Sequence, residues 1–171
     1  MRHRQSLPRL WLMTEERQGD ALFDAIARLP RGAGIVFRHY SLPPTERRAL
    51  WEKVRAAARG KGLTLVVAGP TLPGAHGCHN RLGRGLRTWS AHNLREIRAA
   101  ERAGAHLIFL SPVFATRSHP GAPVLGPRRF AALAHQTRLP VIALGGMDGE
   151  KAGTLGGAYG WAAIDAWLES V

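Results

Sequence analysis

The chain has 171 residues, 45% of them hydrophobic, and 24 basic against 12 acidic residues give it a formal net charge of +12. This length and hydrophobic content fit one domain over residues 1–171, and the lone Cys78 excludes an intrachain disulfide. No apolar run reaches the roughly 18 residues of a membrane span, so the sequence excludes a membrane-spanning protein.

Apolar stretches of strand length alternate with helical patterns along the first part of the chain. Strands are predicted at residues 10–13, 34–37 and 63–67, where most residues are apolar. Between them, residues 21–29 and 43–60 place apolar residues at the 3.6-residue period of a helix. This alternation is typical of βαβ units that build a parallel sheet.

The alternation is interrupted after the third strand. Residues 70–86 are rich in glycine and show no helical period, so we expect a loop there in place of a helix, with a fourth strand near residues 75–79. The alternation then returns, with strands predicted at 87–90, 106–110, 140–144 and 160–164 and helices at 93–103, 127–137 and 150–155.

Eight strands in 171 residues leave about 21 residues for each βα unit. Barrels of eight such units usually have about 250 residues, and about 200 at the least. The pattern therefore predicts an α/β fold, a compact (β/α)8 TIM barrel trimmed between strands 3 and 5. Periodicity leaves open an alternative, a doubly wound sheet of about six strands, which needs no fourth strand.

Polar residues follow several of these strands at their C-terminal ends, where both architectures bind ligands. Arg38 follows the second strand, Ser90 lies at the end of the fifth, and Gly145-Gly146 follow the seventh. Guanidinium, hydroxyl and unobstructed backbone N–H groups suit a phosphate, although a Gly-Gly pair is also typical of a tight turn. We therefore expect an anion site at this end of the sheet.

Two motifs and a shorter third segment carry a resemblance to a known family. Residues 104–121, GAHLIFLSPVFATRSHPG, resemble the GAD, strand, GPVF and Thr-x-Thr-Lys loop of thiamine phosphate synthases. Residues 140–147, PVIALGGM, are similar to their PVVAIGGI, and Ser90-Ala91-His92 to their VSxH. The resemblance implies a barrel and a transferase of thiamine biosynthesis, which joins hydroxymethylpyrimidine pyrophosphate to thiazole phosphate with magnesium. Pro112 stands where the related thiazole tautomerases have His, which argues against that activity.

The resemblance also implies a substrate site. It assigns Arg38 to the pyrophosphate, Ser90 to the pyrimidine, and the hydroxyl groups of Thr116 and Ser118 to the thiazole phosphate. No residue is assigned to catalysis. The implied substrate-binding set is Arg38, Ser90, Thr116, Ser118, His119, Gly145, Gly146 and Ile164.

The largest departure from the family pattern concerns the metal. Ala68-Gly69 stands where the family has the first of two magnesium-binding Asp residues, and no Asp or Glu lies between Glu52 and Glu96 to supply the second. Magnesium prefers oxygen ligands that include carboxylates. The sequence therefore predicts a degenerate metal site with no certain cofactor, and it leaves open a non-catalytic phosphate-binding barrel, a sensor or regulator. The other departures are Val36 for Gln, Tyr40 and His119 for Lys, and Asp165 for a small Ser beside the phosphate.

The remaining signals concern partners and location. His76, Cys78 and His79 lie within four residues, a spacing that does not match zinc sites, so we interpret them as part of a glycine-rich loop. The arginines form no basic block and no helix-turn-helix motif occurs, which favours a small phosphate ligand over a specific nucleic acid. Pro8 and Arg9 interrupt the N-terminal apolar stretch, so we expect a cytoplasmic chain without a signal peptide. The sequence leaves open whether the chain forms a homo-oligomer.

Overall fold

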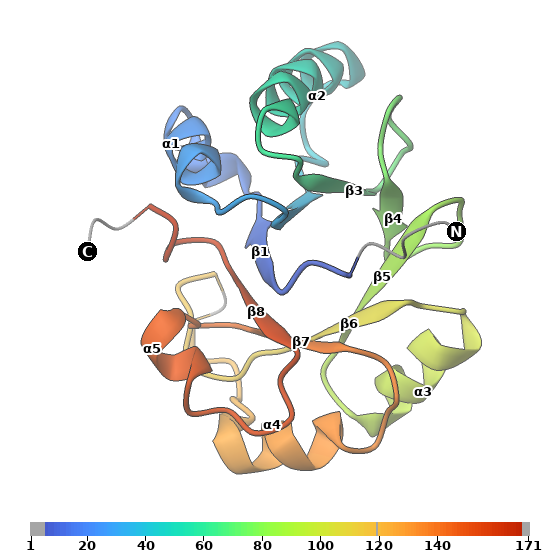
Figure 1. The fold of residues 1–171 in the computed structure, drawn as a ribbon, viewed down its shortest axis with the longest axis vertical. Coiled ribbons are helices and arrows are strands. Elements are labelled where there is room, and N and C mark those ends of the chain that lie inside the picture. Colours follow the sequence, from blue (N-terminus) through green and yellow to red (C-terminus); the bar gives the residue numbers. More distant parts are fainter. Residues whose placement is uncertain (1–5, 119, 169–171) are drawn as a thin grey trace.

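Eight parallel strands close into a barrel in the computed structural model, which describes residues 6–118 and 120–168 (Figure 1). Each strand pairs with its neighbours in chain order, and β1 pairs with β8 to complete the ring. β3 pairs with both β2 and β4, so the predicted barrel is confirmed and the open sheet is wrong. The strands are β1 Leu10–Met13, β2 Gly34–Phe37, β3 Thr64–Ala68, β4 Gly77–His79, β5 Leu86–Ala91, β6 Leu107–Leu110, β7 Val141–Leu144 and β8 Gly160–Ala163.

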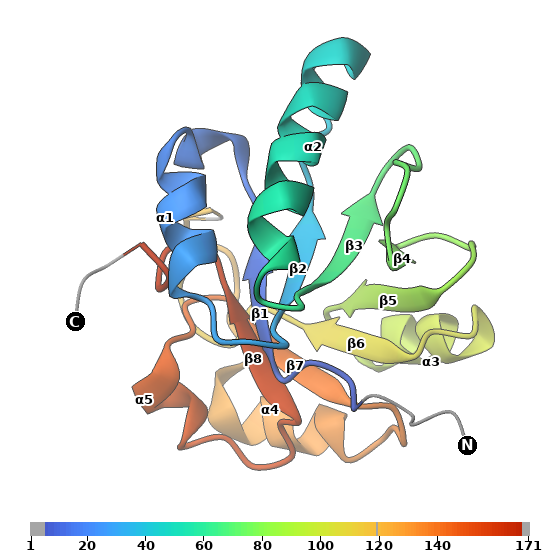
Figure 2. The same cartoon turned by 45° about the horizontal axis from the view of Figure 1, so that its top comes forward.

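Helices cover the barrel unevenly (Figure 2). Residues 69–76 and 80–85 are all described and contain no helix, so the predicted trimming between strands 3 and 5 is confirmed. The predicted helix at 150–155 is shorter, at one turn. The helices are the 3-10 helix η1 Glu16–Gln18, α1 Ala21–Arg28, α2 Pro44–Arg59, α3 Leu94–Arg102, α4 Gly126–Ala134 and α5 Gly149–Ala152. None of these described helices is long and apolar enough to cross a membrane.

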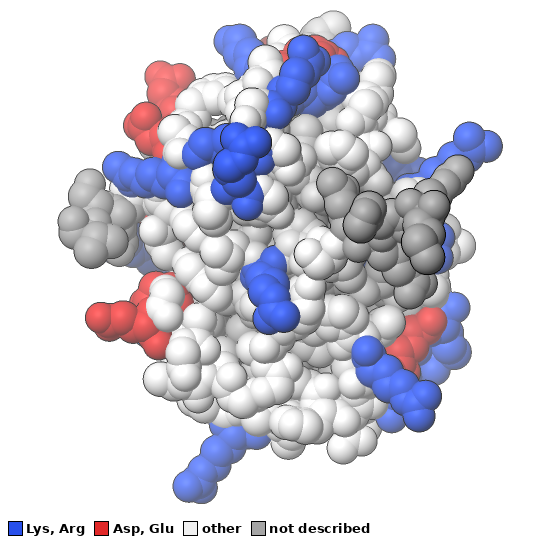
Figure 3. All heavy atoms as spheres, viewed as in Figure 1, with Lys and Arg blue, Asp and Glu red and all other residues white. Residues whose placement is uncertain are grey.

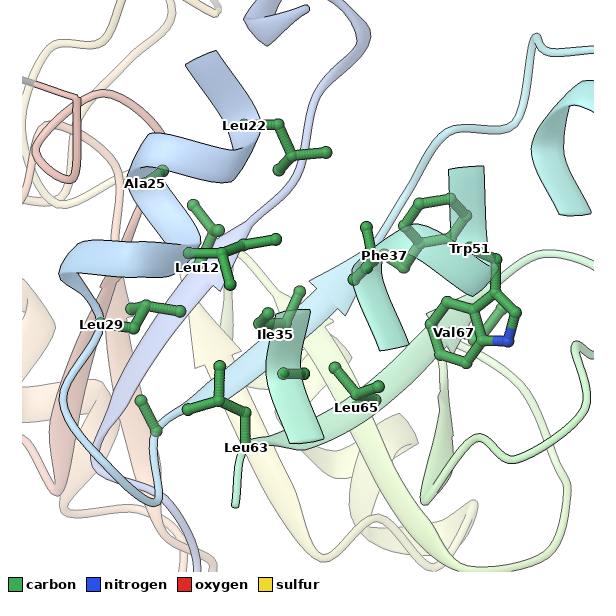
Figure 4. Packing of buried hydrophobic residues seen from close by; sticks show 14 of the residues in the cluster. Leu12, Leu22, Ala25, Leu29, Ile35, Phe37, Trp51, Leu63, Leu65 and Val67 are labelled. Carbon is green, nitrogen blue, oxygen red and sulfur yellow. The ribbon is translucent and has the colours of Figure 1, made fainter. Parts of the chain in front are cut away.

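Alternate strand residues supply two different layers of the core. Leu12, Ile35 and Leu65 point outward and pack under α1 and α2, where Figure 4 shows them beside Leu22 and Trp51. This packing buries the apolar stripes that the 3.6-residue period predicted. The intervening strand residues point into the barrel, where they form a second cluster that includes Trp11, Val36, Val66, Phe109 and Ile142.

Trp11 fills the N-terminal end of the barrel interior. Its ring is fully buried, packs edge-on against Phe109 at a centroid distance of 5.3 Å, and donates its indole N–H to the Pro8 carbonyl. Gly34 makes room for it, because a Cβ there would lie 2.2 Å from the Trp11 ring. A packed floor therefore separates the N-terminal face of the barrel from the C-terminal mouth, where the strands end.

Candidate functional site at the C-terminal mouth

Arg38 enters the mouth from the end of β2. Its Nε donates to the Thr14 carbonyl at 2.9 Å, and its backbone N–H donates to the Thr14 hydroxyl at 2.9 Å. Its Nη2 is buried and has no hydrogen-bond partner among the described residues, while Glu15 Oε1 lies 3.8 Å away. A buried guanidinium N–H without a partner is costly, so an anion bound at this point would gain a charge-assisted hydrogen bond.

Arg17, from η1, bridges two acidic residues across the mouth. Its Nη1 lies 2.8 Å from Asp165 Oδ1, its Nη2 donates to Oδ2 at 3.0 Å, and its Nε pairs with Glu15. The hydrogen bond to Asp165 is the main reason why the pKa of Arg17 is raised above its usual value. Nη2 also reaches the Ser118 hydroxyl at 3.4 Å. Asp165, expected to repel a phosphate, is therefore held in an ion pair.

A cavity of about 230 Å³ lies at the ends of β6, β7 and β8. Thr116, Gly145, Gly146, Ile164 and Asp165 line it. Both glycines have positive φ, and a Cβ on Gly146 would lie 2.3 Å from the Ala115 carbonyl oxygen, so the close turn itself requires glycine. A tight turn is thus enough to explain why both residues are glycine. The same turn places the backbone of Gly145 and Gly146 in the wall of the cavity.

Some residues around this cavity were expected from the sequence, and others were not. Ser118 donates its backbone N–H to the Thr116 hydroxyl at 3.3 Å, which links the two loop residues that the resemblance selected. Lys151, on α5, also lines the cavity and pairs with Asp148 at 2.7 Å. Sequence reasoning missed Lys151 because no motif marks it. His119 lies outside the described residues.

Ser90 belongs to a polar chain inside the barrel. Its hydroxyl lies 3.0 Å from Nε2 of His79, whose Nδ1 lies 2.9 Å from the Thr88 hydroxyl. Burial, with a smaller contribution from the positive charge of Arg38, lowers the pKa of His79 to about 3. His79 is therefore neutral at neutral pH, and its Nε2 positions the Ser90 hydroxyl by a hydrogen bond.

A second cavity, of about 550 Å³, lies over the ends of β3 and β4, where the family pattern has its two Asp residues. Its described lining includes no carboxylate. The carbonyl oxygen of Ala68 accepts from Arg47 at 2.7 Å, and that of Gly69 accepts from Arg81 at 2.8 Å. Guanidinium groups occupy the backbone oxygens that a hard cation would need, so this donor set does not fit magnesium.

The cluster of His76, Cys78 and His79 does not converge on one point. His76 Nδ1 accepts from the Leu65 N–H, the Cys78 thiol contacts the Arg81 carbonyl, and His79 faces the barrel interior. Among the described residues, no group of three His, Cys, Asp or Glu side chains has an arrangement suited to a metal ion.

Comparison with known proteins places this fold and mouth in a family. Residues 81–167 match the family described as Thiamine monophosphate synthase, which is half of the chain. The chain belongs to this family.

Individual thiamine-phosphate synthases match about half of the chain. A putative thiamine-phosphate synthase 2 of Aquifex aeolicus is 42% identical over 83 residues, which cover 47% of this chain and 45% of that protein. The thiamine-phosphate synthase of Chloroflexus aurantiacus is 34% identical over 88 residues, covering 50% and 41%. These matches span less than half the length of either relative.

A solved structure supports the fold over nearly the whole chain. Thiamine phosphate pyrophosphorylase from Pyrococcus furiosus superposes with a TM-score of 0.79 and 21% identity, over 96% of this chain and 88% of that one. The N-terminal half therefore keeps the barrel although its sequence shows little of the family pattern.

The buried His79 gives the stability of the protein a specific pH dependence. Because its pKa is about 3 in the folded state and about 6.5 when unfolded, its contribution is complete above pH 6.5 and is lost as the pH falls toward 3. We expect this group to remove about 2 kcal/mol of unfolding free energy between pH 7 and pH 5. Urea unfolding at both pH values should show a smaller loss in His79→Gln. The surface variant His135→Asn is the control, and an unchanged pH slope in His79→Gln would contradict the assignment.

Proposed function

We propose that the mouth binds a phosphate ester of thiamine biosynthesis, hydroxymethylpyrimidine pyrophosphate or thiazole phosphate, and that magnesium-dependent joining of the two is slow or absent. The observation that carries the proposal is the buried Nη2 of Arg38 in the mouth, which has no hydrogen-bond partner among the described residues and lies 3.8 Å from the Glu15 carboxylate. It supports an anion as the missing partner. The finer choice between the two esters rests on the family resemblance.

The proposed binding divides between two sides of the mouth. Arg38 would hold the pyrophosphate, with Ser90 near the pyrimidine. Across the mouth, the Gly145-Gly146 backbone with the hydroxyls of Thr116 and Ser118 would hold the thiazole phosphate. These roles need only fixed donors in a partly dry site, which is the arrangement that binds phosphate.

Catalysis asks more of the site than binding does. As the bond to pyrophosphate breaks, negative charge develops on the leaving group, and stabilising that charge is usually the largest catalytic contribution. Magnesium supplies this stabilisation in the family. The cavity over β3 and β4 offers Arg81 and backbone oxygens already bonded to guanidinium groups, which supports a degenerate metal site. A barrel that binds without turning over would be a sensor or regulator.

Arg38→Ala should weaken binding of hydroxymethylpyrimidine pyrophosphate about tenfold or more, since a charge-assisted hydrogen bond contributes roughly 1.5–3 kcal/mol. Titration calorimetry measures the affinity, and Arg98→Ala on the outer helix α3 is the control of equal charge change. An affinity for hydroxymethylpyrimidine pyrophosphate equal to that of the unchanged protein would remove Arg38 from the site.

Asp165→Asn tests the ion pair across the mouth. The substitution removes a negative charge beside the proposed phosphate and releases Arg17, so thiazole phosphate should bind roughly five- to tenfold more tightly. The gain should vanish when Arg17→Ala is added, and Asp24→Asn on α1 should change nothing. Weaker binding by Asp165→Asn would mean instead that the carboxylate positions Arg17 for the ligand.

Turnover is tested with the unchanged protein, both precursors and magnesium, by following thiamine phosphate. We expect very slow formation or none. A rate of about 1 per second or above, within the ordinary enzymatic range, would show that the site joins the precursors after all.

A further inference from the structure

A cleft of about 960 Å³ lies at the N-terminal face of the barrel, at the opposite end from the mouth. We call it the basal cleft. Its wall includes the start of β3, the end of α2 and the loops before β2 and β4. Its volume lies within the range of small-molecule sites, and the buried Trp11 floor separates it from the barrel interior. The arginines that line the basal cleft are Arg9, Arg31, Arg55 and Arg59.

The charge of the basal cleft is one-sided, because no Asp or Glu is among its described lining residues. Arg9 and Arg31 each donate to a backbone carbonyl, of Tyr159 and Gly60, and so keep their full charge. Arg55 pairs with Glu52 at 2.7 Å. The side chain of Arg59 makes no hydrogen bond or ion pair with any described residue, and it is exposed. In Figure 3, basic groups lie near the end of α2 and in the middle of the view, whereas acidic groups lie along the outline.

Two arginines of α2 are placed to act together. Arg55 and Arg59 are four residues apart on one helix, so their side chains are neighbours on the same face. Gly74 lets the Arg55 guanidinium lie against the loop before β4, because a Cβ there would come within 2.5 Å of it. A helix C-terminus favours cations and accounts for Arg31 at the Gly60 carbonyl, but it does not account for Arg9 on the other wall.

His76 adds an uncharged donor to this wall. The Leu65 N–H donates to Nδ1 of His76 at 2.9 Å, so the neutral ring carries its proton on Nε2. Apolar surface completes the wall, with Leu7, Leu10 and Leu63. Guanidinium groups, a fixed N–H donor and an apolar patch are together the chemistry that binds a phosphate chain on an organic group.

We propose that the basal cleft binds a compact oligophosphate, free or carried by a nucleoside, with Arg55 and Arg59 as its phosphate ligands. No Phe, Tyr or Trp is among the described lining residues, so the wall lacks the stacking platform that a nucleic-acid strand would use. The site is independent of the proposed function of the mouth.

The test compares two double variants of α2 in the full chain. Arg55→Ala with Arg59→Ala should weaken ATP binding tenfold or more in titration calorimetry, as expected when charged phosphate contacts are lost. Arg48→Ala with Lys53→Ala removes the same charge from the same helix outside the cleft and should change the affinity less than about twofold. Arg59→Glu alone, at an exposed position, should weaken ATP binding as well.

Further measurements distinguish a free oligophosphate from a nucleoside phosphate, and the basal cleft from the mouth. Adenosine should not bind, and inorganic triphosphate binding as tightly as ATP would identify a free oligophosphate. Arg38→Ala should leave ATP binding intact, so failure of the mouth and failure of the basal cleft are distinguishable. Equal losses in both double variants, a loss in Arg38→Ala, no binding of either phosphate probe, or much tighter binding of single-stranded RNA would each overturn the proposal.

Discussion

The hydrogen bonds of the three-residue strand β4 close the barrel, and both candidate sites depend on them. β4 pairs with β3 on one side and β5 on the other, in the sector where no described helix supports the sheet. Gly77 permits the approach, since a Cβ there would lie 1.9 Å from the Leu86 carbonyl oxygen. Without this pairing, β3 and β5 would each have an open edge. His79, which lies on β4, would then lose its buried position beside Thr88 and Ser90.

Charge in the mouth is organised as an alternating series of side chains. Arg38, Glu15, Arg17 and Asp165 follow one another across the opening, each next to a group of opposite sign. Such a series neutralises itself, whereas a pair of carboxylates would need a metal ion to do so. The mouth is therefore built around two guanidinium groups, each beside a carboxylate, whereas the described lining of the cavity over β3 and β4 contains no carboxylate.

Much of the barrel could be predicted from sequence because each strand or helix leaves a local signal. The helix predicted from residue 93 is α3, capped by the Asn93 side chain, which accepts the Glu96 N–H, and the strand of β7 lies within one residue of its prediction. β4 left only a faint pattern because three residues cannot show a period. Its existence is decided by pairing with β3 and β5, which are set in three dimensions.

The candidate site was harder to predict for a different reason. Ser118 and Thr116 belong to a sequence motif, whereas Arg17 and Lys151 do not. Arg17 is held by Asp165, which the fold brings from far along the chain. Lys151 pairs with the nearby Asp148, and no motif marks this pair. Arg17 and Asp165 are 148 residues apart. No local pattern records such a pair.

The single cysteine, Cys78, lies on β4, in the sector between β3 and β5 that no described helix covers. Cys78 is 8% exposed, packs beside Gly83 and donates its thiol to the Arg81 carbonyl, so the loop after β4 shields it from reagents. A thiol in that position becomes reactive mainly when β4 separates from its loop. The rate of its alkylation would therefore count the opening events of the least supported part of the sheet, because local unfolding, not the chemistry of the thiol, sets access.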